Sequence, residues 1–277
     1  MTEVIKQVEE FEPIHSAHSI EQVAFVIQFD QEFNDQTLIK LRLAAEQFKD
    51  DLPGVTEIQS IGFAFGIQIA PTQQSQVAGL VRKSVGRDGA LECELRMDKT
   101  GITFVTTRYT RWNSAWEQVN KYLEVLLPIY LEKANLLAIG LNYVDKFAWE
   151  GDANKCNPAL LLQKDSKYVC KHIFETKEFW HSHTGVFIRD DINTKRLLNL
   201  NVDYLDDPRP EGIKRVISVT TTVTDQFNQA GYTPLVHDAG NKEFISKHMY
   251  SMHEFSKQVF SNLITPEMSK RIELTVG

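Results

Sequence analysis

Cysteine is scarce in this sequence of 277 residues, which contains Cys93, Cys156 and Cys170 and no CxxC spacing. An odd number of cysteines without that spacing disfavours both a disulfide framework and a thiolate zinc site, and is typical of a reducing compartment. No apolar run reaches the roughly 20 residues that a membrane-spanning helix needs. The first residues are acidic and lack an apolar segment, so we expect no signal peptide. The sequence therefore predicts a cytoplasmic protein with no membrane partner.

Positive charge is also in deficit, with 30 lysines and arginines against 37 aspartates and glutamates and a net charge of −7. Proteins that bind nucleic acid usually carry a basic surplus, because contacts with phosphates supply most of their affinity. Small basic clusters occur at Arg82, Lys83 and Arg87, and again at Arg108 and Arg111. Such clusters are more often solvated loop and edge positions than phosphate patches. The charge balance disfavours nucleic acid as a partner.

Short catalytic motifs are absent too. The sequence has no GxGxxG loop, Walker loop, HExxH, GxSxG or kinase signature. These absences disfavour nucleotide enzymes, metalloproteases and α/β-hydrolases, although they leave other enzyme classes open. We therefore assign no catalytic residue and expect no cofactor.

The most regular pattern lies between Arg108 and Trp149. Apolar residues there recur at i, i+3, i+4 and i+7, as on the core-facing side of a helix: Trp116, Val119, Leu123, Leu126, Leu127 and Tyr130. Ser114 and Glu117 have the spacing of a capping box, and Pro128 predicts a kink or the end of the regular helix. Residues 136–147 then predict a strand.

The order of the remaining patterns predicts the fold class. The first half reads strand, helix, three strands, helix and strand, and the second reads as a strand meander followed by a helix. We predict an α+β fold with antiparallel sheets and long amphipathic helices packed on one face, in two similar halves. The predicted parts are a flexible arm at 1–18, a half with ferredoxin-like order at 19–150, and a β-meander plus C-terminal helix at 158–277. A divergent duplication is left open.

Two histidines are the candidate metal ligands. His181 and His183 lie two residues apart, so on a strand they share a face and could begin a metal site. His172 or Asp203 could complete it, while surface histidines are the commoner alternative. Carboxylates expected at strand ends, such as Asp145 and Asp203, could bind a metal or a ligand or act as acid and base. Such residues are also common turn formers.

Aromatic residues concentrate in the central stretch and fall into two groups. Trp116 and Tyr130 have helical spacing, which predicts core positions. Trp112 lies at the predicted corner between strand and helix, beside Arg111. Aromatic and arginine side chains at such a corner are typical of binding surfaces. We therefore select Arg108, Arg111 and Trp112 as candidate binding residues, together with Asp145.

The central stretch resembles a known family. RYTRWNSAWEQVNKYLEVLL followed by LLAIGLNYVDKF is similar to the mid-chain signature of a large, sporadically distributed family of prokaryotic proteins of similar length. Members show a Tyr/Trp-led helix and then an RIGLRYIN-like strand. This sequence departs from that strand at Asn142 and Asp145, where Arg and Asn are usual, which puts a shared polar site there in doubt.

Both ends of the chain resemble the same family. EQVAFVIQF fits its opening strand, and Met252-His253, Phe260 and Ile264-Thr265 match its closing LH…F…IT helix. The family has no assigned reaction. Its patchy distribution associates it with mobile elements, phage-defence loci and toxin–antitoxin modules.

These observations predict a non-catalytic cytoplasmic protein-interaction module, antitoxin-like or associated with defence. A protein partner, encoded by a neighbouring gene, is expected, and a homo-oligomer is left open. The alternative is a metal- or nucleotide-dependent enzyme or ligand-binding protein that uses His181, His183 and strand-end carboxylates.

Overall fold

Strands account for 44% of the described residues and helices for 30%. The computed structural model describes residues 9–62, 74–189, 194–209, 212–227 and 242–276. The strands are β1 (Glu10–Pro13), β2 (Ile20–Phe29), β3 (Gly54–Gly62), β4 (Gln74–Val85), β5 (Leu91–Asp98), β6 (Gly101–Thr106), β7 (Leu136–Glu150), β8 (Trp180–Arg189), β9 (Lys195–Arg209) and β10 (Gly212–Gln226). The helices are α1 (Asp35–Ala45), α2 (Trp112–Leu131), α4 (Lys242–Ser261) and α5 (Pro266–Arg271), with short 3-10 turns η1 (Glu46–Phe48), η2 (Ala153–Lys155), η3 (Pro158–Leu160) and η4 (Lys171–Phe174).

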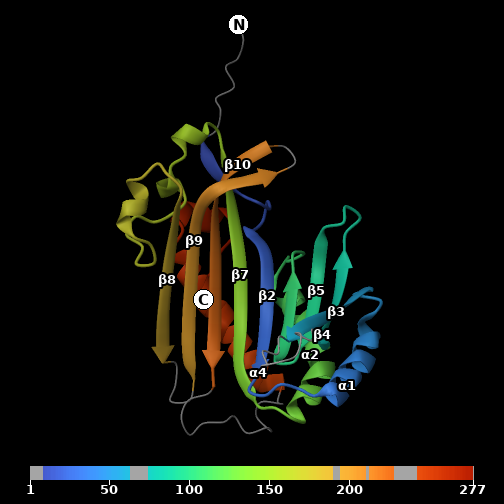
Figure 1. Ribbon diagram of the computed structural model, residues 1–277. Helices are drawn as coiled ribbons and strands as arrows, with labels where there is room; N and C mark the ends of the chain where they lie inside the picture. Colours follow the sequence, from blue (N-terminus) through green and yellow to red (C-terminus); the bar gives the residue numbers. More distant parts are fainter. Residues whose placement is uncertain (1–8, 63–73, 190–193, 210–211, 228–241, 277) are drawn as a thin grey trace, which may run out of the picture. The chain divides into compact units, whose positions relative to one another are not determined.

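The predicted fold class is wrong. Instead of an α+β arrangement of separate sheets under long helices, the strands form one mostly antiparallel ten-stranded sheet. Their order is β3-β4-β5-β6-β2-β7-β10-β9-β8, and β1 also pairs with β7 (Figure 1). The reason lies in β7, which is longer than its pattern predicts and ends at Glu150 rather than Phe147. Both edges of β7 are paired, one with β2 and the other with β10, so the sheet is not interrupted at the predicted boundary.

The chain divides into two compact units. The first unit contains residues 1–23, 141–225 and 247–277, and the second contains residues 24–140 and 226–246. None of the helices in the described ranges is both long and apolar enough to cross a membrane.

The second unit has an aromatic interior. Its strands follow the order β3-β4-β5-β6-β2, and the printed pairs among β3 to β6 are antiparallel. The ring of Phe25 on β2 lies 5.7 Å from Trp112 and 6.0 Å from Trp116, both on α2. Tyr122, six residues after Trp116 on α2, packs edge-on against Phe48 at 4.9 Å. The helical stripe of α2 therefore fills this core with rings.

The helix α2 confirms part of its sequence prediction. Trp116 and Tyr130 are buried, as their helical spacing predicts. The predicted capping box is wrong, because α2 begins before Ser114 and its N-cap residue, Arg111, makes no side-chain cap. The helix also continues past Pro128 to Leu131. The Tyr130 hydroxyl donates to the carbonyls of Asp98 and Gly101, both at 2.8 Å, which fixes the turn between β5 and β6.

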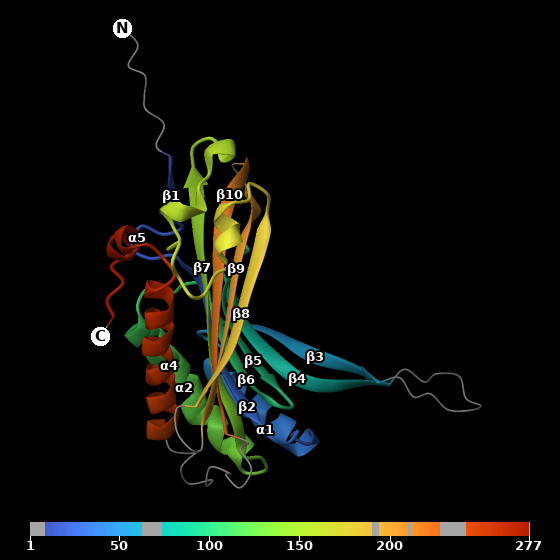
Figure 2. The same cartoon turned by 90° about the vertical axis from the view of Figure 1, so that its left-hand side faces the viewer.

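The first unit contains strands in the order β7-β10-β9-β8, with β8 and β9 antiparallel. Alternate residues of β9 face inward and are fully buried, among them Leu198, Leu200 and Val202. Helix α4 runs beside these strands (Figure 2), and its Phe260 stacks on Phe147 of β7 at 6.3 Å. Within the predicted arm, Glu10–Pro13 form β1, which pairs with β7.

Candidate functional site

A fully buried carboxylate lies in the first unit. Asp225, at the end of β10, accepts hydrogen bonds from Arg196 on β9, from Nε at 2.7 Å and from Nη2 at 2.8 Å. His248 Nδ1 on α4 donates to Oδ2 of the same carboxylate at 2.7 Å, the oxygen that also accepts from Arg196 Nη2. Burial alone would raise the pKa of Asp225, but the bonds from Arg196 and His248 outweigh burial and lower it. The carboxylate is therefore held ionised.

Arg196 extends this ionic cluster to α4. Its Nη2 also donates to Ser251 Oγ at 3.0 Å, and its guanidinium lies 5.5 Å from the ring centroid of Phe255. A bidentate arginine–carboxylate pair is among the strongest polar contacts that proteins make. Arg196, Asp225, His248 and Ser251, which we call the ionic cluster, thus join β9, β10 and α4 through charge-assisted bonds.

The ionic cluster was not predicted, although the sequence contains a signal for it. Every second residue of β9 is buried, beginning with Arg196 and continuing with Leu198, Leu200 and Val202. The same holds in β10 for Val219, Thr221 and Val223, and Asp225 is the last residue of that series. A charge on the apolar face of a strand needs a buried partner. Arg196 and Asp225 are two such charges of opposite sign, and His248 lies in the apolar stripe of a helix. A contact among these three residues could therefore have been predicted from the sequence.

Asp145 is the predicted binding residue with the most unusual surroundings. The prediction that it marks a strand end is wrong, because β7 runs on to Glu150 and the Asp145 side chain is buried. Its Oδ1 accepts a hydrogen bond of 2.7 Å from Ser19 Oγ. Burial raises the pKa of Asp145 to about 7, and the bond from Ser19 offsets only part of that rise. Asp203, also predicted at a strand end, lies inside β9.

A second buried titratable group lies on the same face of β7. Tyr143 Oη and His253 Nδ1 share a hydrogen bond of 2.9 Å between β7 and α4. Burial, with a smaller contribution from Lys257, lowers the pKa of His253 to about 4. The imidazole is therefore neutral at physiological pH.

The two candidate metal ligands lie on the exposed side of β8. Each is bonded to its register partner on β9: His181 Nδ1 to Asp203 Oδ1 at 2.5 Å, and His183 Nδ1 to Asn201 Oδ1 at 2.6 Å. The structure thus brings Asp203 to His181, whereas His172 lies in η4. In the part of the chain that is described, no three His, Cys, Asp or Glu side chains gather as a metal site would require.

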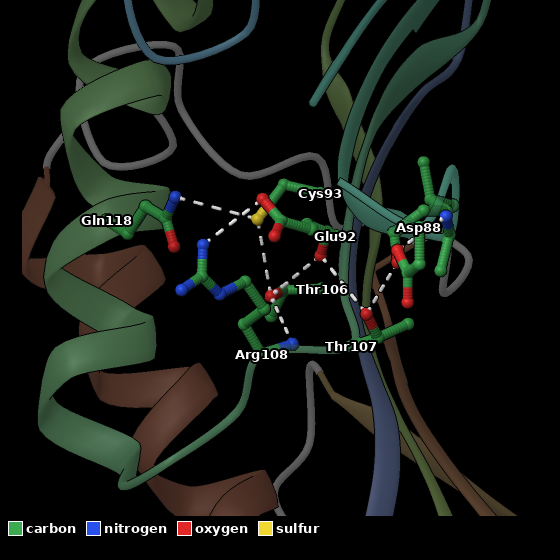
Figure 3. Close-up of polar contacts among 9 residues, drawn as sticks. Asp88, Glu92, Cys93, Thr106, Thr107, Arg108 and Gln118 are labelled. Atoms are coloured by element: carbon green, nitrogen blue, oxygen red, sulfur yellow. Dashed lines mark hydrogen bonds and ion pairs between the residues drawn. The ribbon is translucent and has the colours of Figure 1, made fainter. Parts of the chain in front are cut away.

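The remaining predicted binding residues lie in the second unit. Arg108 is exposed and pairs with Glu92 at 3.1 Å (Figure 3). Arg111 is exposed, and its Nη1 donates to the Thr110 carbonyl at 3.3 Å. Trp112 is only 7% exposed and stacks on Trp116 at 6.1 Å, so it belongs to the aromatic core rather than to an open corner.

Figure 3 also shows a polar group beneath α2 that was not predicted. The buried Cys93 thiol contacts Thr106 Oγ1 at 3.3 Å, and Gln118 Nε2 on α2 donates to the sulfur at 3.8 Å. Thr106 Oγ1 in turn donates to the Glu92 carbonyl at 3.2 Å. These bonds tie β5 and β6 to α2 around a thiol that is shielded from solvent.

The last strand in the sheet order, β8, has one open edge. Its ten register pairs with β9 run from Trp180 to Arg189 without a bulge. Across the described ranges, no backbone hydrogen bond joins β8 to a segment other than β9. Val186 is 39% exposed and its neighbour Phe187 is 54% exposed. Because adjacent residues of a strand face opposite ways, this edge presents apolar side chains on both faces.

No protein-family profile matches this chain, and no curated protein matches it closely enough to show a relationship.

Proposed function

We propose that this protein is a protein-interaction module that receives an extended segment of a partner protein along the open edge of β8. The observation that carries the proposal is a ten-residue edge strand with a regular register and apolar side chains exposed on both faces. Unpaired backbone groups on such a strand are a template for an added strand. Side chains of the partner would cover Val186 on one face and Phe187 on the other.

The opposite end of the strand order supports the choice of β8. The register of β3 with β4 shifts between Ile58 and Gln59, and Glu57 beside that shift is exposed. Bulges and charges are the devices by which proteins protect an edge from pairing. Strand β8 has no bulge, and Gly185, Val186 and Phe187 in its second half carry no charge.

The alternative, a metal- or nucleotide-dependent enzyme, has less support. His181 and His183 are each bonded to a single partner on β9, and no third ligand joins them in the described ranges. We further propose a cytoplasmic location, on the basis of cysteine usage, and a partner encoded by a neighbouring gene, as in defence or antitoxin modules. These two points rest on the sequence and on the family resemblance.

The test compares two lysine substitutions at exposed apolar residues. Val186→Lys places a charge on the open edge, whereas Leu43→Lys places one on α1, where Leu43 is 70% exposed. We expect wild type and Leu43→Lys to retain the same stoichiometric partner in a pull-down analysed by mass spectrometry, and Val186→Lys to lose it. Amide hydrogen exchange in the complex should slow along β8. Retention of the partner by Val186→Lys, or no partner for wild type, would overturn the proposal.

A further inference from the structure

We infer that the segment received by β8 is acidic, with carboxylates beside the apolar residues that cover Val186 and Phe187. This inference rests on the proposed function, since it assigns the chemistry of the partner at the same edge. It follows from the placement of lysines on the two sides of β8 in a protein whose net charge is −7.

The first of these lysines is Lys195 at the start of β9. Its Nζ lies 3.8 Å from the ring centroid of Phe187, so an ammonium group covers the exposed aromatic side chain of the edge. No ion pair of Lys195 occurs in the described part of the chain.

The second lysine lies on the other side of the strand. The Tyr168 carbonyl accepts a hydrogen bond of 2.8 Å from Thr184 Oγ1, which holds the segment before β8 against the strand. Lys167, directly before Tyr168, is exposed, and its Nζ lies 5.2 Å from the Tyr168 ring centroid. Thr184 and Phe187 have opposite parity along the strand and so face opposite ways. Lys167 and Lys195 therefore flank the edge from its two sides.

Within the described segments beside this edge, the carboxylates of Asp203 and Asp165 do not cancel these charges. Asp203, on β9, is bonded to His181 at the far end of the strand. Asp165 is the single acid between residues 164 and 171, against the three lysines Lys164, Lys167 and Lys171. A partner strand with carboxylates would gain attraction on both faces and would be steered to the edge. A basic or neutral strand would gain only the backbone and apolar contacts.

A display library of randomised linear peptides tests the inference. The full chain and its Val186→Lys variant are panned in parallel, and only peptides that depend on Val186 are kept. We expect these peptides to be enriched in Asp and Glu next to Val, Ile or Phe. A synthetic binder should lose about tenfold in affinity when its carboxylate is replaced by an amide. The loss should shrink at high salt, because exposed charges are screened.

Charge reversal in the protein supplies the control. Lys195→Glu should lower the affinity for the acidic peptides and should select basic peptides from the library. Lys133→Glu, at an exposed lysine of the second unit, should change neither the affinity nor the selected peptides. Peptides that depend on Val186 but show no acidic enrichment would overturn this inference and leave the proposed function standing. A library without any peptide that depends on Val186 would overturn both. Circular dichroism of each variant verifies that the fold is intact.

Discussion

The interiors of the two units differ in chemistry. In the second unit, α2 covers a core of stacked rings, in which Trp112 and Trp116 lie against Phe25. In the first unit, α4 covers strands whose buried positions include Asp145, Asp225 and Arg196. Packed aromatic rings stabilise a fold because their apolar surface is removed from water, and small shifts of the rings change that stabilisation little. A buried charge tolerates them poorly, because a carboxylate without its partner is costly.

The difference shows that the first unit tolerates the free-energy cost of burying ionisable groups. Ionisable groups in a core contribute little net stability compared with apolar residues of the same volume. They do fix geometry, since the ionic cluster admits one register of β9, β10 and α4. The strand that carries Arg196 is also the one that pairs with β8, along the edge opposite its open edge. We interpret the ionic cluster as the anchor that holds β9, and with it β8, in a fixed position.

The largest expected effect comes from breaking the ionic cluster. Asp225→Ala leaves Arg196 buried without its carboxylate, and we expect a loss of about 3 to 5 kcal/mol in the free energy of unfolding. The double variant Arg196→Leu with Asp225→Leu removes both charges and should recover most of that loss. Urea unfolding monitored by circular dichroism measures both. A double variant no more stable than Asp225→Ala would contradict the ionic explanation.

Asp145 should make the first unit sensitive to pH. Its pKa in the folded protein is about 7 against an ordinary 3.8, so the folded state binds the extra proton between these values. Stability from this group is full below 3.8 and is lost as the pH rises through 7, by about 4 kcal/mol at most. Asp145→Asn keeps the acceptor for Ser19 and removes the charge. The free energy of unfolding of the variant should therefore rise relative to that of wild type as the pH rises from about 4 to about 8.

The second unit supplies the control for this titration. The pKa of Tyr122 is raised to about 12, mainly by burial, so Tyr122 does not titrate in that interval. Tyr122→Phe should shift the free energy of unfolding by a similar amount at every pH tested. If Tyr122→Phe changed the pH profile as Asp145→Asn does, the contrast between the two interiors would fail.

These two interiors were not equally predictable from sequence. Trp116 and Tyr130 could be assigned to a core because helical spacing is a local property. The contact of Asp225 with Arg196 depends on which strands are neighbours, and the order of strands is not encoded in any one segment. The same limit applies to β8: its strand pattern was legible, but its place at the end of the sheet was not. Trp112 was misplaced because α2 begins before the capping residues that its sequence offers.

His253 should oppose Asp145 in its response to pH. Its pKa in the folded protein is about 4 against an ordinary 6.5, so the unfolded chain binds the extra proton between these values. Stability from this group is full above 6.5 and is lost as the pH falls toward 4, by about 3 kcal/mol. His253→Gln should therefore destabilise less in acid than at neutral pH, relative to wild type. Equal destabilisation at both values would show that Tyr143 and His253 contribute through packing alone.

The smallest effect on stability is expected at the edges. Val186→Lys on β8 and Thr56→Lys on β3 each alter an exposed side chain of a terminal strand, and we expect each to change the free energy of unfolding by less than about 0.5 kcal/mol. Their effects on binding should diverge, because β3 is already protected by its bulge and by Glu57. Thr56→Lys should bind partner like wild type, and Val186→Lys should not. Equal losses of binding in the two stable variants would mean that general surface charge, rather than the open edge of β8, governs the interaction.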